Sequence, residues 1–158
     1  MVGKRLSLAR SIEHGMATQY RHTQPGVLMV VVSAVVTILC ASLGLMIPTP
    51  ARWLLWAVAI GNVILGWLFS SLTVEVNDNE VRWHFGPGLW AYRISRTDID
   101  NVRPVRNSWL NGFGIRMRPG FRLYNVSGLD AVELHLKTGD IRRIGTDDPN
   151  GLATALAS

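Results

Sequence analysis

The sequence predicts an α-helical membrane hairpin of two transmembrane helices, followed by a small mainly-β domain of about seven antiparallel strands and a C-terminal helix. Two observations lead to this α+β architecture. Residues 26–47 and 53–72 are apolar stretches without a charged side chain, and only residues 48–52 separate them. After residue 72 the pattern changes to short alternating segments divided by turn residues. The expected parts are a basic arm (1–25), a transmembrane hairpin (26–72) and a β domain (73–158).

The two apolar stretches have the length and composition of membrane spans. At a rise of about 1.5 Å per residue, about 20 residues reach the ~30 Å of a bilayer core. The prolines of the link, Pro48 and Pro50, cannot continue a helix, which predicts a tight turn. Trp53 then lies near one membrane interface and Trp67 near the other.

The positive charges predict the orientation of the hairpin. The arm carries four Lys or Arg residues against the single acidic Glu13, whereas the link carries only Arg52. Such an excess marks the cytoplasmic side, and two spans return the chain to the side from which it started. We therefore expect both termini in the cytoplasm. The net charge of +5 is divided among the three parts, so the high pI does not indicate a nucleic-acid-binding domain.

The arm itself has two open interpretations. Apolar residues between Lys4 and His22 recur at a spacing of three to four, which is compatible with a short amphipathic helix on the inner leaflet. The other interpretation is a disordered, positively charged topology signal.

Small and weakly polar residues suggest how the two helices pack. Membrane helices associate through such residues and through a few polar contacts. Asn62 is the only strongly polar side chain of the second span, and we predict that it contacts Thr37 or Ser33, worth about 1 kcal/mol. Two helices enclose no lumen, so this is a packing role rather than a channel lining. The expected packing residues are Ser33, Thr37, Ala41, Ala57, Gly61, Asn62 and Gly66.

The C-terminal part reads as short strands and one helix. Turn residues at 77–79, 86–88 and 138–139 divide the alternating segments. Asp148 followed by Pro149 predicts a helix start, with Leu152, Ala155 and Leu156 closing one end of the β structure. Residues 97–102 are short and ambiguous. The expected strands are 73–77, 80–85, 89–94, 114–118, 121–126, 131–137 and 140–144.

Two sequence segments resemble those of a known family. After the two spans, residues 81–90 (Val-Arg-Trp-His-Phe-Gly-Pro-Gly-Leu-Trp) and residues 93–102 (Arg-Ile-Ser-Arg-Thr-Asp-Ile-Asp-Asn-Val) resemble bacterial membrane proteins with a pleckstrin-homology-like (PH-like) domain. The segment from Leu123 to Pro149 is similar to their second sheet and helix start. The resemblance implies a bent seven-stranded sheet capped by a helix, no enzyme activity, and a place in the bacterial inner membrane.

The candidate binding surface is a stretch rich in arginine. Residues 103–128 contain no acidic residue, and aromatic side chains are interleaved with the arginines. Beside a membrane anchor, such arginines contact anionic lipid head groups at about 1 kcal/mol each. The alternative is that Arg116 and Arg118 form only the solvated face of a strand. The expected lipid or partner contacts are Arg103, Arg106, Trp109, Arg116, Arg118 and Arg122.

No catalytic, metal or cofactor site is expected. The four histidines are scattered, and Cys40 is the only cysteine and lies in the first apolar stretch. Asp147 and Asp148 resemble a paired-carboxylate site, but a helix cap explains both better. No glycine-rich phosphate loop is present.

The sequence therefore predicts a membrane-anchored binding or scaffolding module at the cytoplasmic face of the membrane. In the alternative interpretation it is a small assembly or accessory subunit. The hairpin would then contact a larger membrane complex or a second copy of the chain.

Overall fold

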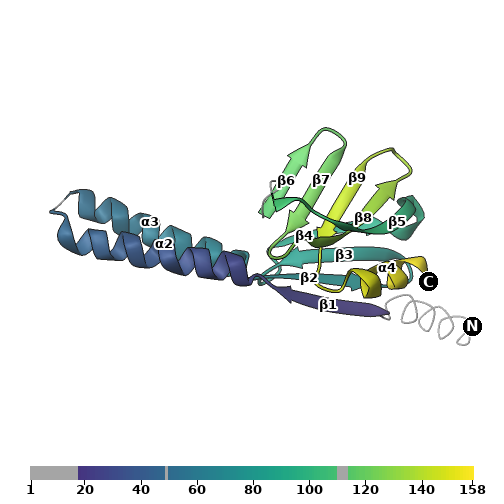
Figure 1. The fold of residues 1–158 in the computed structure, drawn as a ribbon, viewed down its shortest axis with the longest axis horizontal. Coiled ribbons are helices and arrows are strands. Elements are labelled where there is room, and N and C mark those ends of the chain that lie inside the picture. Colours follow the sequence, from purple (N-terminus) through teal and green to yellow (C-terminus); the bar gives the residue numbers. More distant parts are fainter. Residues whose placement is uncertain (1–17, 49, 110–113) are drawn as a thin grey trace, which may run out of the picture.

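Two long helices project from two packed β-sheets in the computed structural model, which describes residues 18–48, 50–109 and 114–158 (Figure 1). The helices are α2 (Val27–Met46), α3 (Ala51–Leu68) and α4 (Pro149–Ala157), and Arg96–Asp98 form a 3-10 turn. The strands are β1 (Tyr20–Pro25), β2 (Ser71–Val76), β3 (Glu80–Phe85), β4 (Trp90–Ser95), β5 (Ile99–Arg106), β6 (Gly114–Arg118), β7 (Phe121–Asn125), β8 (Asp130–Leu136) and β9 (Ile141–Gly145).

Helices α2 and α3 are long and apolar enough to cross a membrane. They pack against each other as a hairpin, but few of their residues are buried: Gly44 in α2, and Ala59 and Leu68 in α3. A core helix of a soluble protein hides a whole apolar stripe against its neighbours. Most of this apolar surface is therefore left uncovered by residues 18–48, 50–109 and 114–158.

The first sheet has the antiparallel order β1-β2-β3-β4, and its edge strand β1 precedes the hairpin in the sequence. Residues 20–25 had been expected in the basic arm. They carry no alternating apolar pattern, because their inward positions hold Tyr20, His22 and Gln24. The β structure thus begins before the hairpin and resumes after it. The two interpretations of the arm depend mostly on residues 1–17, which lie outside the described residues.

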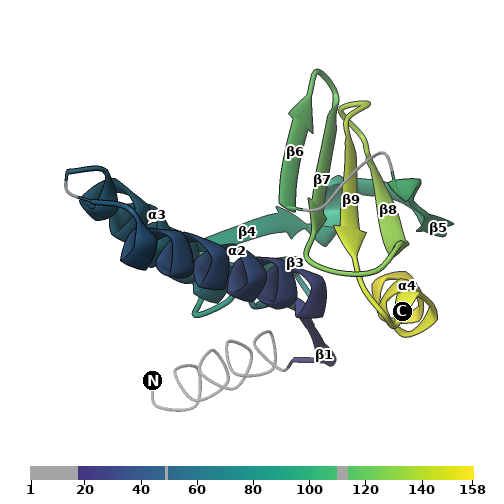
Figure 2. The same ribbon diagram turned by 60° about the vertical axis from the view of Figure 1, so that its left-hand side comes forward.

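The hairpin replaces the turn that would otherwise join β1 to β2. The two strands stay paired up to Pro25 and Ser71, and the Gly26 N–H still donates to the Ser70 carbonyl oxygen at 2.7 Å. Gly26 alone leads from β1 into α2, and Phe69 with Ser70 lead from α3 into β2. These short links leave little freedom between the helices and the sheets (Figure 2).

The second sheet has the order β5-β8-β9-β7-β6 and corrects the prediction of about seven antiparallel strands. The described residues form nine strands, and β7 runs parallel to β9. A simple meander would place β8 beside β7. Instead β8 pairs with β5, and β9 fills the position next to β7. The local pattern shows where strands lie but not this order.

The core lies between the two sheets, and α4 covers one end of it. The N-cap side chain of Asp148 accepts the Gly151 N–H at 3.0 Å, with Pro149 at the start of the helix, as predicted. Leu152 and Leu156 are buried, and Ala155 packs against the same cluster. The buried cluster comprises Leu72, Val74, Val76, Val81, Trp83, Phe85, Tyr124, Val126, Val132, Leu134, Ile144, Leu152 and Leu156.

Candidate functional site

Asn62 links the two long helices near their middle. Its Nδ2 donates to the Ser33 carbonyl oxygen at 2.7 Å and to Thr37 Oγ1 at 2.9 Å. In return, the Ser33 hydroxyl donates to the Asn62 carbonyl oxygen at 2.8 Å. The contact that the sequence predicts for Asn62 is confirmed. In lipid such bonds matter because apolar burial gives little driving force between helices.

Small residues allow close approach of α2 and α3 on only one face of α3, the face that contains Gly66. A Cβ added at Gly66 would lie 2.7 Å from Ser33 Cβ, so only glycine fits there. Among the other expected packing residues, Thr37 and Ala41 are half-buried. Ala57 is exposed, and an added Cβ at Gly61 would meet no atom within 4 Å.

The position of Ala57 and Gly61 follows from helix geometry. Ala59, which is buried, stands two residues from each, and two residues correspond to about 160° around a helix. The face that packs on α2 contains Ala59, Asn62 and Gly66. The small pair Ala57 and Gly61 therefore lies on the opposite face of α3 and does not take part in the hairpin contact.

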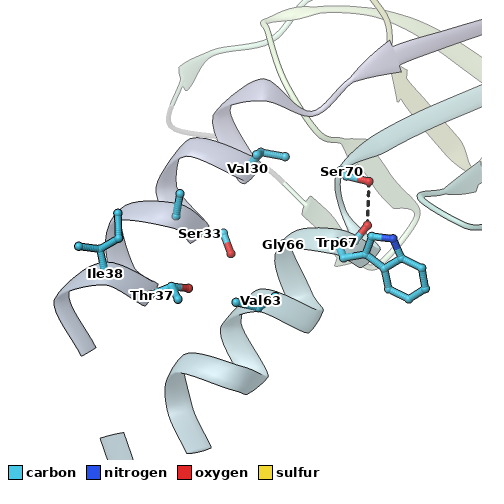
Figure 3. A pocket seen from close by; sticks show the side chains of 9 residues that line it. Val30, Ser33, Thr37, Ile38, Val63, Gly66, Trp67 and Ser70 are labelled. Atoms are coloured by element: carbon cyan, nitrogen blue, oxygen red, sulfur yellow. Dashed lines mark hydrogen bonds between the residues drawn. The ribbon is translucent and has the colours of Figure 1, made fainter. Parts of the chain in front are cut away.

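A groove of about 500 Å³ runs between α2 and α3 beside this contact (Figure 3). Its walls are mainly apolar, with Val30 and Ile38 from α2 and Val63 from α3. At the end nearest the sheets, the Ser70 hydroxyl donates to the Trp67 carbonyl oxygen at 2.8 Å. The groove offers an apolar surface rather than a polar binding site.

The candidate arginines do not form one patch, because two of them face acidic residues from β8. Arg103 lies directly opposite Glu133 in the strand register, and its Nε and Nη2 donate to Glu133 Oε1 at 2.9 and 2.6 Å. Arg106 lies opposite Asp130, at 3.9 Å between Nε and Oδ1. The acid-free stretch is therefore partly neutralised by a strand that follows it in the sequence.

Glu133 is the centre of a buried ion-pair network. Its side chain is only 2% exposed and lies between Arg103 on β5 and Arg143 on β9. Arg143 Nε donates to Oε2 at 3.0 Å, and His135 Nε2 lies 2.8 Å from Oε1. Burial favours a raised pKa, but the hydrogen bonds from Arg143, Arg103 and His135 outweigh it and lower the pKa of Glu133 to about 2. The carboxylate stays charged at neutral pH.

Arg143 also fixes the start of the link from β5 to β6. Its Nη1 donates to Asn107 Oδ1 at 2.8 Å, and its guanidinium lies 5.2 Å from the centre of the Phe121 ring. β5 and β6 are the two edges of the sheet, and the buried Asn107 is the first residue after β5.

The remaining candidates lie on β6, on β7 and in the link. Arg116 and Arg118 are exposed on the edge strand β6 and share one face of it. Arg122 pairs with Met117 and therefore belongs to the opposite face. Trp109 is 74% exposed. None of these three arginines has an ion-pair partner in the described part of the chain.

Sequence reasoning missed Glu133, Arg143, His135 and Asn107. The pattern of β8, Ala-Val-Glu-Leu-His-Leu, does carry a signal: its polar residues Glu133 and His135 alternate with apolar ones as on a solvated face. Glu133 is nevertheless buried, because two arginines from neighbouring strands cover it. That covering depends on strand order, which the sequence pattern does not reveal.

The edge strand β1 is tied to the cap of α4 by polar contacts. The Tyr20 hydroxyl donates to Asp148 Oδ2 at 3.0 Å, and His22 pairs with Asp147. Burial and the nearby Asp148 carboxylate raise the pKa of Tyr20 above its ordinary value. Asp147 and Asp148 therefore serve strand and helix contacts.

The described histidines stand apart from one another. His22 and His135 each bind a carboxylate, and His84 lies on β3. Within residues 18–48, 50–109 and 114–158 no three His, Cys, Asp or Glu side chains come together as metal ligands. His14 lies outside these residues.

Comparisons of this chain with protein-family models and with curated proteins find no match.

Proposed function

We propose that this chain is a non-enzymatic binding or scaffolding module anchored in a bacterial inner membrane. In this proposal α2 and α3 span the bilayer, and the sheets form a PH-like domain at its cytoplasmic face. Two helices of suitable length and apolarity support the first part. Two packed sheets with a C-terminal helix support the second, although β1 and the parallel β7–β9 pair depart from the expected strand arrangement.

The observation that carries the proposal is the position of the hairpin within the first sheet. Because α2 and α3 occupy the β1–β2 turn, the anchor and the binding domain form one rigid unit rather than two parts on a flexible linker. A rigid anchor sets which surface of the domain faces the bilayer. This arrangement suits a protein that presents a binding surface at a fixed height and angle.

We assign that surface to β6. A Cβ at Gly114, the first residue of β6, would lie 3.8 Å from Met29 of α2, so the strand starts at the base of the hairpin (Figure 1). Arg116 and Arg118 follow at steps of about 7 Å, both exposed. Anionic lipid head groups are the proposed ligands, at about 1 kcal/mol for each arginine near the surface. Arg103 and Arg106 contribute less, since acidic partners already face them.

Labelling of single cysteines from the outside of the cell tests whether α2 and α3 span the membrane in the proposed orientation. In a Cys40→Ser background, Ala51→Cys marks the start of α3 and Ser158→Cys marks the C-terminal end. A membrane-impermeant maleimide added to intact cells should label Ala51→Cys at once, and Ser158→Cys only after lysis. Equal labelling of the two positions in intact cells, or release of the protein by alkaline carbonate, would contradict the proposal.

A second candidate function rests on the outer face of α3. Ala57 and Gly61 form a small-residue pair there: Ala57 is exposed, and a Cβ added at Gly61 would meet no described atom within 4 Å. Such pairs let another membrane helix approach closely. In this alternative the chain is an accessory subunit or a homo-oligomer that assembles through the hairpin, and Gly61→Leu discriminates it from the first function.

A further inference from the structure

The turn between β3 and β4, residues 86–89, lies directly against the end of α3. Gly86 has a φ of +43°, and a Cβ there would lie 2.6 Å from the Leu68 oxygen and 2.8 Å from the Trp67 oxygen. Glycine is required both for this backbone conformation and for this close approach. The Gly86 N–H also donates to the Ser71 carbonyl oxygen at 2.9 Å. The turn is therefore held on the junction between α3 and β2.

Large apolar side chains at this junction face outward. Leu89 is 69% exposed, Trp90 44% and Trp67 58%. The centre of the Trp90 ring lies 5.8 Å from that of Phe69, the C-cap residue that follows α3. From Gly86 to Tyr92 the chain carries no charged residue. Among the described residues, Leu89 at the end of the turn and Trp90 at the start of β4 leave apolar surface uncovered, which marks a contact surface.

We propose that this turn is a second contact with the bilayer, in which Leu89 and Trp90 insert into the interfacial layer of the leaflet where α3 ends. The inference rests on the proposed function, since it takes α2 and α3 as membrane spans. The phospholipid interface is the occupant because the turn touches the last residues of α3. A bilayer that surrounds Trp67 must therefore also reach the turn. Tryptophan is enriched at this depth because its ring is apolar and its N–H is polar.

The second contact has a consequence for the β domain. The links at Gly26 and at Phe69–Ser70 join the hairpin to the β1–β2 side of the first sheet. The turn adds a second point on the β3–β4 side of the sheet. Together they fix the tilt of the domain and keep the base of β6, where Gly114 lies beside Met29, at the membrane surface.

Spin-label depth measurements on the full-length protein in phosphatidylcholine–phosphatidylglycerol vesicles test the inference. The label is attached at Leu89→Cys in a Cys40→Ser background. Val63→Cys, on an exposed position of α3, is the membrane reference, and Thr138→Cys, in the β8–β9 turn, is the aqueous reference. At Leu89 we expect oxygen to be several-fold more accessible than a water-soluble nickel complex, as at Val63. Thr138 should show the reverse order.

The outcomes separate this inference from the proposed function. If Val63 is buried in lipid but Leu89 behaves like Thr138, the turn contact is wrong and the anchor stands. If Val63 is also aqueous, the anchor itself is wrong, and the inference fails with it. If the Leu89 variant folds poorly, a spin label at Pro87→Cys, on the exposed turn, provides an independent measurement of the same depth. An aqueous signal at both turn positions overturns the inference.

Discussion

Glu133 illustrates how a charged residue serves stability here rather than chemistry. The carboxylate accepts hydrogen bonds from Arg103 and Arg143, and His135 lies beside it, so its charge is compensated on both oxygens. A buried carboxylate would be costly without these partners. Because the bonds come from β5 and β9, the network holds three strands of the second sheet together.

Glu133→Gln should destabilise the domain by about 3 kcal/mol at pH 7, because it leaves the largely buried Arg143 without its counter-charge. Asp130→Asn, at the exposed pair with Arg106, is the matched control and should change the unfolding free energy by less than about 1 kcal/mol. Denaturant unfolding in detergent measures both, followed by the tryptophan fluorescence of the chain, to which the buried Trp83 contributes as one of six tryptophans. Equal losses in the two variants would contradict a special role for Glu133.

The lowered pKa of Glu133 predicts how the free energy of unfolding depends on pH. The folded pKa of about 2 lies below the ordinary value of 4.5, so the contribution of Glu133 is complete above pH 4.5 and is lost as pH falls toward 2. The shift corresponds to about 3 kcal/mol at most. The wild-type protein should therefore lose stability over this window, and Glu133→Gln should show a flatter curve. The same denaturant titrations at several pH values provide the comparison.

At the scale of elements, local signals predict some features and not others. The hairpin and its Asn62 contact were predictable because a single strongly polar residue in an apolar span has few possible partners. The cap at Asp148 was predictable because the signal lies within four residues. Strand β1 was not, since its inward positions are polar. The Arg103–Glu133 pair was not either, because it depends on the register of strands 30 residues apart.

The two glycines of α3 should respond oppositely to the same substitution. Gly66→Leu places a side chain against Ser33 and should weaken the hairpin by about 1–3 kcal/mol. Gly61→Leu faces open space and should leave the hairpin intact. Helix unfolding by SDS titration in mixed micelles, followed by far-UV circular dichroism, measures this difference.

The same pair decides between the two functions. If the hairpin is an assembly surface, Gly61→Leu abolishes co-purification of differently tagged copies or of a membrane partner. If the hairpin serves as an anchor alone, Gly61→Leu changes neither association nor hairpin stability. Loss of association with Gly66→Leu alone would instead indicate that the intact hairpin, rather than its outer face, is needed.

For the whole molecule, the decisive feature is that the α2–α3 hairpin is inserted between two paired strands of one β domain. The core draws residues from β2, β3, β7, β8, β9 and α4, none of which belongs to the hairpin. Strand β1 lies on the far side of the hairpin in sequence but at the edge of the first sheet in space. Removing everything before Ser71 would therefore delete a strand and expose the edge of β2.

Replacing residues 27–69 by an Asn-Gly turn should therefore yield a soluble, folded β domain. Gly26 and Ser70 are already hydrogen-bonded neighbours across the pair, so a two-residue hairpin turn can join them without altering the register. We expect a single cooperative thermal transition and native near-ultraviolet circular dichroism from Trp83 and Tyr124, which pack edge to face in the core. The fragment that begins at Ser71 is the control, and it should unfold at lower temperature or aggregate because β1 is missing. If that fragment proves as stable as the turn-closed chain, β1 contributes nothing to the fold and the rigid link between anchor and domain is refuted.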